Sequence, residues 1–431
     1  MYLPNTIFAP AQLLLPVNSV DLQKWAVIAC DQFTSQPEYW NQVEQIVDQS
    51  PSTLHLILPE IYLGKQDESN RIEKIRHAMN QYLNNGTFYT TPPAFVRVER
   101  TLSNGIIRRG LIGTVDLEAY DYSAKSTTPI RATEGTVIER LPPRIRVRDG
   151  APLESPHIMI LIDDPAKTVI EPLFEKSLPI AYQTKLMLDG GSIQGALVNS
   201  NEDIQQIQNA LSSLFTDSTT RYSGGNGHFV YAVGDGNHSL ATAKSIWESL
   251  KAKGASHDHP ARFALCEIVN IHDQSLNFEP IHRVVFNVNV QSFLEKLASS
   301  LSANIALTDK LDINAASARS QIIPFAHSAG FGTITITNPV HILTCSTLQH
   351  FLDHSLDSFS GAALDYIHGD AALLILSKKE NTLGFFLPPI SKHSFFQSIY
   401  KDGTLPRKTF SIGHAQDKRY YFECRSIIHS H

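Results

Sequence analysis

The chain has 431 residues, of which 42% are hydrophobic and 18% charged, and its formal net charge is −6. This composition is typical of globular proteins and leaves little room for extensive disorder, while the length predicts two or three domains. A net negative charge provides no general attraction to nucleic acid, so nucleic acid is disfavoured as a partner. A local basic pocket can still capture a small anion.

The four cysteines are far apart and form neither a CxxC pair nor a Cys/His ligand pattern, which argues against a disulfide framework or a zinc finger. The N-terminal stretch is apolar but lacks the basic start of a signal peptide, and no apolar run reaches about 18 residues. We therefore predict a cytoplasmic protein without membrane contact that acts on a small molecule. Both a monomer and a homo-oligomer are compatible with the sequence.

Apolar runs and helical periodicity alternate over the first third of the chain. Residues 25–30 and 54–58 are predicted to be buried strands. Between them, Ser35 and the glutamate three residues later have the spacing of a capping box, which predicts a helix start. Apolar residues recur at helical spacing over 72–83, and a residue at positive φ in 84–86 would end that helix.

The middle of the chain is richer in strands. Residues 94–118 form two β-rich runs around Ser103-Asn104-Gly105, a sequence suited to a hairpin turn. The apolar run 157–162 predicts a strand that is covered on both faces, and a helical stripe follows over 204–214.

Beyond residue 284 the chain offers a further set of strands and helices, which includes 333–337, 342–345, 372–377 and 383–387. We predict an α/β (mixed α+β) protein, with mixed sheets and flanking helices. Its two regions are expected at 1–283 and 284–431. No Pro/Gly/Ser linker marks the boundary, so the two regions could interleave.

A Gly-rich turn joins a predicted strand to a predicted helix near the middle of the chain. Residues 228–233 form the strand, and Leu240 begins the apolar stripe of the helix. Two glycines allow close backbone approach to a ligand, and the amides at a helix start favour an anion such as phosphate. The turn consists of Gly234, Asp235, Gly236, Asn237, His238 and Ser239.

In this turn Asn237 is a plausible cap, and Asp235 and His238 could reach the same ligand. The alternative is purely structural, because Asp-Gly turns commonly close strand-helix connections. The turn matches neither the P-loop nor the Rossmann glycine pattern, so both of those sites are rejected.

A second cluster is rich in arginine. Arg131, Thr133 and Glu134 lie in the segment RATEGT, and Arg140, Arg144, Arg146 and Arg148 follow it. Guanidinium groups match phosphate and carboxylate oxygens, and Glu134 could orient or deprotonate an attacking hydroxyl. The alternative is an exposed basic strand edge on which the arginines from 144 to 148 face water.

Weaker candidates lie elsewhere in the chain. Asp31, Gln32, Thr34 and Ser35 follow the first predicted strand at a usual ligand-contact position of α/β folds, with a helix cap as the alternative role. Asp163-Asp164 could bind Mg²⁺. The segment 257–259 resembles a metal site without a third ligand. Arg407 and Lys408 add late basic groups, whereas Lys418-Arg419 is interpreted as surface charge.

Several segments together suggest a known family. The segments are WAVIACDQFTSQPEYW, RATEGTVIERLPPR, GDGNHSLATAK, ALCEIVNIHDQSLNFEPIHRVV and LPRKTF. The chain resembles, over nearly its whole length, the family catalogued as domain of unknown function 1015. More typical members carry a DGHHR-type sequence at the helix start, which is similar to a motif of ParB/sulfiredoxin-like proteins and free-serine kinases.

The resemblance implies a ParB/sulfiredoxin-like core that binds nucleotide phosphates. Asp235, Gly236 and His238 occupy matching positions of the motif, whereas Asn237 replaces the first His and Ser239 replaces the Arg. Because that arginine is lost, the family's phosphate-binding role is carried over to this chain less directly, unless Arg131, Arg140 or Arg144 supplies the missing positive charge.

The resulting hypothesis is a kinase-like phosphotransferase that uses a nucleotide, ATP or ADP, with Mg²⁺, and acts on a hydroxylated metabolite such as an amino acid. The Gly234–Ser239 turn would cradle phosphate and Glu134 or Asp235 would act as general base. His238 would contact a phosphoryl oxygen, and Arg140 and Arg144 would offset developing charge.

Three alternatives remain open. The first is a phosphatase-type hydrolase, and the second is a non-catalytic nucleotide-responsive binding or regulatory protein. The third is a site between the two halves of the chain, with a purely structural turn.

Overall fold

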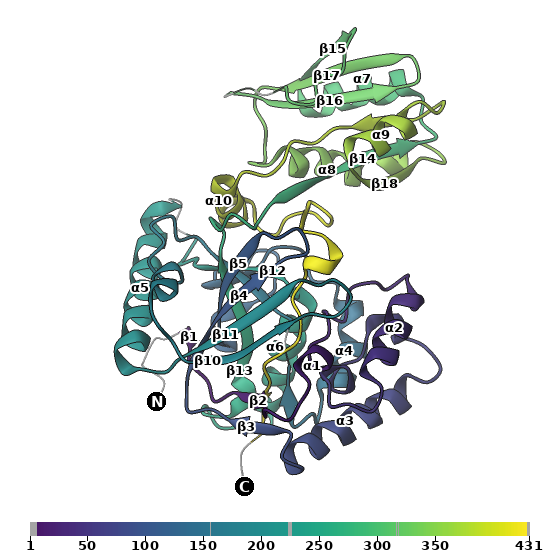
Figure 1. The fold of residues 1–431 in the computed structure, drawn as a ribbon. Coiled ribbons are helices and arrows are strands. Elements are labelled where there is room, and N and C mark those ends of the chain that lie inside the picture. Colours follow the sequence, from purple (N-terminus) through teal and green to yellow (C-terminus); the bar gives the residue numbers. More distant parts are fainter. Residues whose placement is uncertain (1–6, 156, 223–225, 316, 318, 429–431) are drawn as a thin grey trace. The chain divides into compact units, whose positions relative to one another are not determined.

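The computed structural model describes residues 7–155, 157–222, 226–315, 317 and 319–428 (Figure 1). The chain forms two compact units. The first unit comprises 1–276 together with 414–431, and the second comprises 277–413. The boundary expected at 283/284 falls inside strand β14 (Phe278–Phe286), and the chain returns to the first unit at its C-terminal end.

The elements of the first unit mix short and long strands with helices. Its strands are β1 (Phe8–Ala9), β2 (Leu14–Pro16), β3 (Phe88–Thr90), β4 (Phe95–Thr101), β5 (Ile107–Asp116), β6 (Tyr120–Asp121), β7 (Ile130–Ala132), β8 (Leu153–Glu154), β9 (Met159–Ile162), β10 (Ile180–Lys185), β11 (Ser192–Val198), β12 (Tyr231–Asp235), β13 (Phe263–Asn270) and β21 (Arg425–Ser426). Its helices are α1 (Leu22–Trp25), α2 (Pro37–Val47), α3 (Glu68–Asn84), α4 (Leu141–Arg148), α5 (Asn201–Arg221) and α6 (Asn237–Ala252).

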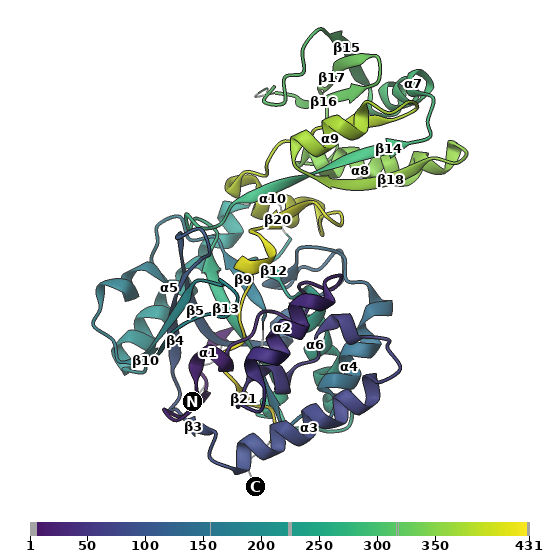
Figure 2. The same ribbon diagram turned by 45° about the vertical axis from the view of Figure 1, so that its right-hand side comes forward.

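A large mixed sheet organises the first unit, with strand order β10-β11-β4-β5-β13-β9-β12-β7-β6 and β1 beside β5. Most neighbours are antiparallel, but β13 pairs with β9, and β12 with β7, in parallel. Helices α2 and α3 pack on one face and α5 and α6 on the other. Figures 1 and 2 show α5 on the opposite side of the sheet from α2 and α3. This arrangement confirms the predicted mixed α/β class.

The two faces of the sheet follow from side-chain alternation along its strands. On β13, Leu265 belongs to the core under α2 and α3, whereas Ala264 and Cys266 belong to the core under α5 and α6. All residues of β13 are buried, as expected for a strand covered on both faces. The same holds for β9, which confirms the strand predicted within 157–162.

The hairpin of β4 and β5 also confirms its prediction. Leu102 N donates to Ile106 O at 2.8 Å across the turn, and Gly105 has φ +81°. The helix predicted over 72–83 is part of α3, and Gly86 after it has φ +79°. Gly accepts this left-handed conformation without a Cβ clash.

Two predicted strands are not strands. Residues 25–30 begin with the end of α1 and continue as extended chain, joined to the C-terminal segment by an isolated bridge between Ile28 and Tyr420. Residues 54–58 begin in a 3₁₀ helix, Thr53–Leu56. Both runs are apolar because they are buried, and a short buried run does not by itself distinguish strand from helix.

Two further expectations are corrected. The helix predicted after Ser35 starts at Pro37, and its N-cap Gln36 makes no side-chain capping bond, so no capping box forms. The arginines from 144 to 148 do not lie on a strand edge, because Leu141–Arg148 is helix α4, which has Pro in its first turn.

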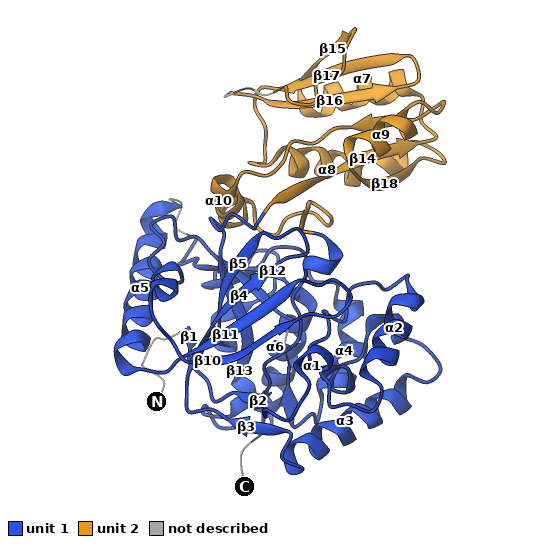
Figure 3. Ribbon diagram, in the orientation of Figure 1, with its two compact units in different colours: residues 1–276, 414–431 blue, residues 277–413 orange. Residues whose placement is uncertain are grey.

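The second unit, orange in Figure 3, is a sheet of order β15-β17-β16-β19-β14-β18 with helices on both faces. Helices α7 and α8 cover one face and α9 the other. Besides β14, its elements are β15 (Ala303–Thr308), β16 (Gln321–His327), β17 (Gly330–Ile336), β18 (Ala363–His368), β19 (Leu383–Phe385), β20 (Phe410–Ile412), α7 (Val290–Leu301), α8 (Thr344–Ser355), α9 (Asp370–Ser377) and α10 (Lys392–Asp402). In the described part of the chain, no helix is both long and apolar enough to cross a membrane.

Candidate functional site

The Gly-rich turn connects β12 to α6, as the sequence predicts. Strand β12 ends at Asp235, Gly236 is the N-cap with φ +76°, and α6 begins at Asn237. A Cβ on residue 236 would lie 3.0 Å from Ile158 Cα. Both the backbone conformation and the close approach therefore require glycine at this position.

Two parallel strands bring the Arg-rich segment to this turn. Strand β7 pairs with β12, so that Ala132 lies opposite Val233 and both chains leave the sheet at the same edge. Just beyond, Thr133 N donates to Asn237 Oδ1 at 3.3 Å and Thr133 Oγ1 donates to Val233 O at 2.7 Å. Thr133 thus meets the turn, although about a hundred residues separate it from Asn237 in sequence, and Glu134 is the next residue in the chain.

The first turn of α6 is not capped by a side chain. The sequence suggests Asn237 as the cap, but the N-cap is Gly236, which has no side chain that could cap the helix. The amide of Asn237 instead contacts Thr133 Oγ1 at 3.3 Å and Val233 O at 3.4 Å, and His238 Nε2 accepts from Val137 N at 3.4 Å. A helix start with a glycine cap presents its amides and its positive dipole end to an anion.

Asp235 is paired with a lysine from the far end of the chain. Lys418 Nζ lies 3.2 Å from Asp235 Oδ2, and both side chains are 15% exposed. Burial alone would raise the pKa of Asp235, but Lys418, His157 and the Gly236 amide outweigh it and hold the pKa below its usual value. The carboxyl is therefore ionised at neutral pH.

The interpretation of Lys418-Arg419 as surface charge is wrong. Arg419 is buried, with Nε 3.0 Å from Glu267 and a second nitrogen 2.6 Å from Glu423. Lys418 lies beside it in the C-terminal segment, whose path through the first unit brings both cations inside. No local pattern in the sequence indicates this path.

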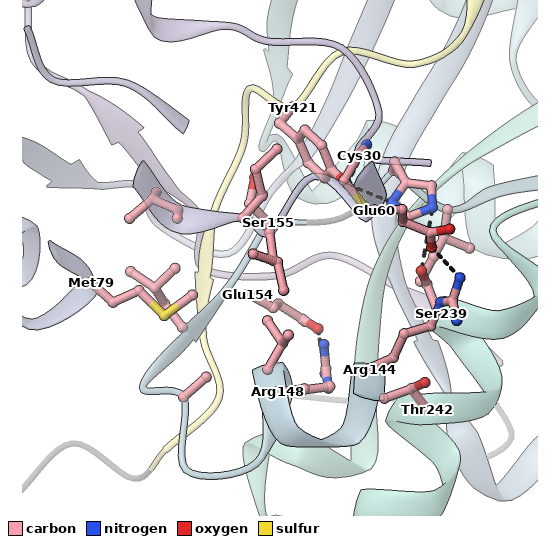
Figure 4. A pocket seen from close by; sticks show the side chains of 18 of the residues that line it. Cys30, Glu60, Met79, Arg144, Arg148, Glu154, Ser155, Ser239, Thr242 and Tyr421 are labelled. Atoms are coloured by element: carbon pink, nitrogen blue, oxygen red, sulfur yellow. Dashed lines mark hydrogen bonds and ion pairs between the residues drawn. The ribbon is translucent and has the colours of Figure 1, made fainter. Parts of the chain in front are cut away.

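The arginines of α4 face acidic partners. Arg144 pairs with Glu60, Arg146 lies 2.5 Å from Glu68, and Arg148 lies 2.5 Å from the buried Glu154. Helix α4 packs against α6, and Arg144 and Arg148 line the pocket beside the helix start. Figure 4 shows Arg144 and Arg148 pointing from α4 towards the pocket.

The other predicted basic residues are Arg131, Arg140, Arg407 and Lys408. Arg131 is buried, donates to Thr128 O at 3.0 Å, and lies over the Phe229 ring. Arg140 is exposed at the end of a 3₁₀ turn. Arg407 and Lys408 belong to the second unit, where their backbone carbonyls accept from Arg283.

A pocket of about 130 Å³ lies beside the first turn of α6 (Figure 4). One wall is apolar and comes mainly from the segment around the first 3₁₀ helix, from α3 and from α4. Its apolar residues are Leu56, Ile57, Leu58, Leu63, Met79, Val147, Ala151, Leu153 and Ile158. The polar lining residues include Cys30, Glu60, Arg144, His157, Ser239 and Tyr421. Ser239 is thus the member of the predicted turn that lines the pocket.

The family model now decides which family this is, because it matches residues 14–355 under the description "Protein of unknown function (DUF1015)". The chain belongs to the DUF1015 family. A comparison of the DUF1015 chain with the curated proteins gave no match.

Solved structures similar to the DUF1015 chain are remote. A mutant of free serine kinase in complex with AMP shares 11% identity at a TM-score of 0.38, covering 70% of this chain and 94% of that one. A mutant of free serine kinase in complex with ADP shares 10% identity at a TM-score of 0.38, and the match covers 72% of this chain and 90% of that one. A conserved hypothetical protein from Pyrococcus furiosus shares 11% identity at a TM-score of 0.35, and the match covers 73% of this chain and 94% of that one.

The acidic and histidine candidates of the DUF1015 chain bond to other protein groups. Asp163 contacts Tyr222 OH at 2.6 Å and His272 Nε2 at 2.7 Å, while Asp164 accepts from Thr168 N at 2.6 Å. His259 Nδ1 accepts from Ala261 N at 3.1 Å. Within the described ranges, no three His, Cys, Asp or Glu side chains are placed to hold a metal ion.

Sequence reasoning missed His157, Glu60, Lys418 and Tyr421 of the DUF1015 chain. His157 is the polar residue that opens an otherwise apolar strand segment, and this was an available signal. The other three lie in segments whose approach to the turn depends on tertiary structure. Asp31, by contrast, was among the weaker sequence candidates, and the structure places its Oδ2 3.9 Å from His157 Nε2.

Proposed function

We propose that the chain is a phosphotransferase that moves a phosphoryl group between a nucleotide and a small hydroxylated metabolite. The observation that supports it best is the convergence of three distant segments at the N-terminal end of α6. They are the segment containing Thr133 and Glu134, the turn at Asp235–His238, and the C-terminal segment with Lys418.

The helix start supports phosphate binding. Gly236 lets the backbone approach a ligand closely, and the first-turn amides of α6 carry a partial positive charge. Lys418 and Arg144 add full positive charges near this end of the helix. Phosphoryl transfer depends mainly on positioning and on stabilising such charge, so this is the chemistry that the residues suit.

The carboxylates of the site have different roles in this proposal. Asp235 has a lowered pKa and pairs with Lys418, which makes it a weak base. Glu134 follows Thr133 at the same sheet edge and is therefore the better candidate to accept the proton of the metabolite hydroxyl. His238 would contact a phosphoryl oxygen, and Arg140 would add charge from its exposed turn.

Mg²⁺ is part of the proposal. In proteins Mg²⁺ keeps several waters and is usually held by one or two carboxylates together with substrate phosphates. Asp235 and Glu134 are the carboxylates at this sheet edge that fit such a role. The metal would neutralise phosphate charge when it is bound with the nucleotide.

Thermal unfolding tests nucleotide binding. The protein is heated with ATP, ADP, AMP, phosphate or pyrophosphate, each with and without Mg²⁺. A ligand at 100 times its Kd stabilises by about 2.7 kcal/mol, which gives a measurable rise in Tm. We expect a Mg²⁺-dependent rise with a nucleotide that is lost in His238→Ala and kept in His354→Ala, an exposed histidine of the second unit.

Turnover is then followed by ³¹P NMR with the nucleotide that binds and a set of hydroxylated amino acids. A new phosphomonoester signal that disappears in Glu134→Gln is expected. Binding without any new signal would favour the non-catalytic nucleotide-responsive protein. If no phosphate compound changes Tm, the proposal is wrong.

A further inference from the structure

Ser239 and His157 lie side by side in the pocket beside α6. Ser239 Oγ is 3.3 Å from His157 Nε2, although 82 residues separate them in sequence. The His157 side chain is only 7% exposed, and both residues line the pocket. A hydroxyl in hydrogen-bond contact with an imidazole is the arrangement in which a base can activate a nucleophile.

The direction of the Ser239 hydroxyl is not that of an ordinary helix serine. Serine and threonine in helices often bond back to a carbonyl of the preceding turn. Thr242, three residues further along α6 in the same pocket, does this, with Oγ1 2.7 Å from His238 O. Ser155, also in the pocket, donates to Glu423 O at 3.0 Å. Of these three hydroxyls, that of Ser239 is the one that contacts an imidazole.

Tyr421 orients the imidazole from its other side. The Tyr421 hydroxyl lies 2.8 Å from His157 Nδ1 and accepts from Cys30 N at 3.2 Å. Burial, with Cys30 beside it, holds the pKa of Tyr421 well above its usual value, so the hydroxyl stays protonated. When its proton points to the Cys30 thiol, its oxygen accepts from Nδ1–H, which leaves the Nε2 lone pair facing Ser239.

The surroundings suit an acyl group and a developing negative charge. The wall opposite Ser239 is apolar, and the pocket volume of about 130 Å³ is close to the ~150 Å³ cavity that accepts benzene. Ser239 lies in the first turn of α6, whose positive dipole end stabilises an oxyanion formed there. Asp31 Oδ2, 3.9 Å from Nε2, is placed to stabilise a protonated imidazole.

We propose that Ser239 is a nucleophile, with His157 as its base and Tyr421 as a positioning residue, and that this centre hydrolyses esters of short apolar carboxylic acids. Ser239 Oγ attacks the carbonyl carbon while its proton passes to His157 Nε2. The bond to the alcohol oxygen breaks, and His157 returns the proton to the departing alcohol. Water then attacks the acyl-serine, His157 takes its proton, and the carboxylic acid leaves as Ser239 regains a proton.

This activity goes beyond the proposed phosphotransferase and can be tested without a nucleotide. The full chain is treated with a fluorophosphonate, which labels activated serines, and analysed by intact-mass and peptide mass spectrometry. Hydrolysis of p-nitrophenyl butyrate is measured in parallel. We expect one adduct on Ser239 and an ester hydrolysis rate that falls about 10²- to 10⁴-fold in Ser239→Ala and His157→Gln.

Ser245→Ala is the matched control, because Ser245 lies on the same helix α6 but outside the pocket, with its Oγ 3.4 Å from the Tyr122 hydroxyl. Labelling and hydrolysis should be unchanged in it. Tyr421→Phe keeps the ring and removes the hydroxyl, so kcat should fall while KM stays the same. Absence of an adduct, or equal hydrolysis by the wild type and Ser239→Ala, overturns the proposal. The phosphotransferase is judged separately by the nucleotide-dependent Tm, which needs no ester.

Discussion

Buried ionic pairs are the residue-scale feature that shapes the candidate site. Asp235 and Lys418 are 15% exposed each, and Arg419, Glu267 and Glu423 beside them are almost completely buried. Removing one partner of such a pair is costly because the other charge is left without compensation in a poorly hydrated place. The region around Asp235 therefore depends on these charges for its stability.

Lys418→Met tests this dependence through pH. In the wild type, the depressed pKa of Asp235 means that its ionised form contributes stability above the usual value of 3.8, and this contribution is lost as the pH falls below it. The variant should lose up to about 3 kcal/mol at neutral pH. Without the cation the pKa of the buried carboxyl rises, so the variant should regain stability between about pH 7 and pH 5.

Urea unfolding at several pH values measures both effects. Lys251→Met is the control, since Lys251 forms an exposed pair with Glu118 whose loss should cost less than about 1 kcal/mol. A Lys418→Met variant as stable as wild type at neutral pH would show that the pair does not hold Asp235 in its ionised form.

At the scale of elements, the turn from β12 to α6 determines where the helix start lies. Gly236 combines a left-handed backbone with close contact to Ile158. Helix α4 lies beside this region, and only Leu141 of its eight residues is buried. Since little apolar surface holds the helix, the ion pairs of its arginines with Glu60, Glu68 and Glu154 hold it in place.

Gly236→Ala should destabilise the protein by about 2 kcal/mol or more, because the left-handed conformation costs about 1–2 kcal/mol and the new methyl group presses on Ile158. Gly86→Ala is the matched control. It has nearly the same φ, +79°, but nothing within 4 Å of the added Cβ, so it should show only the conformational cost. Equal losses in denaturant unfolding would contradict a tight turn at Gly236.

At the scale of the whole molecule, the first unit is built from both ends of the chain. Residues 414–431 return to it after the second unit. Tyr421 N donates to Val27 O at 2.8 Å, Trp25 Nε1 donates to Phe422 O at 2.9 Å, and Cys424 pairs with Leu14. The C-terminal segment is thus an internal part of the first unit.

Deleting residues 414–431 should therefore unfold the first unit while 277–413, which has its own core, remains folded. Limited proteolysis followed by mass spectrometry should yield a resistant fragment close to 277–413 and rapid digestion of the rest. A first unit that resists digestion without the C-terminal segment would show that this segment is dispensable. The full chain should protect both units.

Local patterns in the sequence predicted the mixed α/β class, the β4–β5 hairpin, the helices α3, α5 and α6, and the Gly-rich turn before α6. These succeed because periodicity and turn chemistry act between residues close in sequence. The same patterns wrongly predicted strands at 25–30 and 54–58. The residues there are apolar because they are buried, and burial does not require a strand conformation.

Tertiary structure alone decided which charged groups share the site. Thr133 meets Asn237 because β7 and β12 are parallel neighbours, and Lys418 meets Asp235 because the chain returns after a separate unit. Arg131 lies in the predicted cluster yet points to Thr128 and Phe229. The sequence by itself determined the Gly-rich turn between β12 and α6, because that turn is local. Its neighbours are set by strand order and long-range packing, which no local pattern encodes.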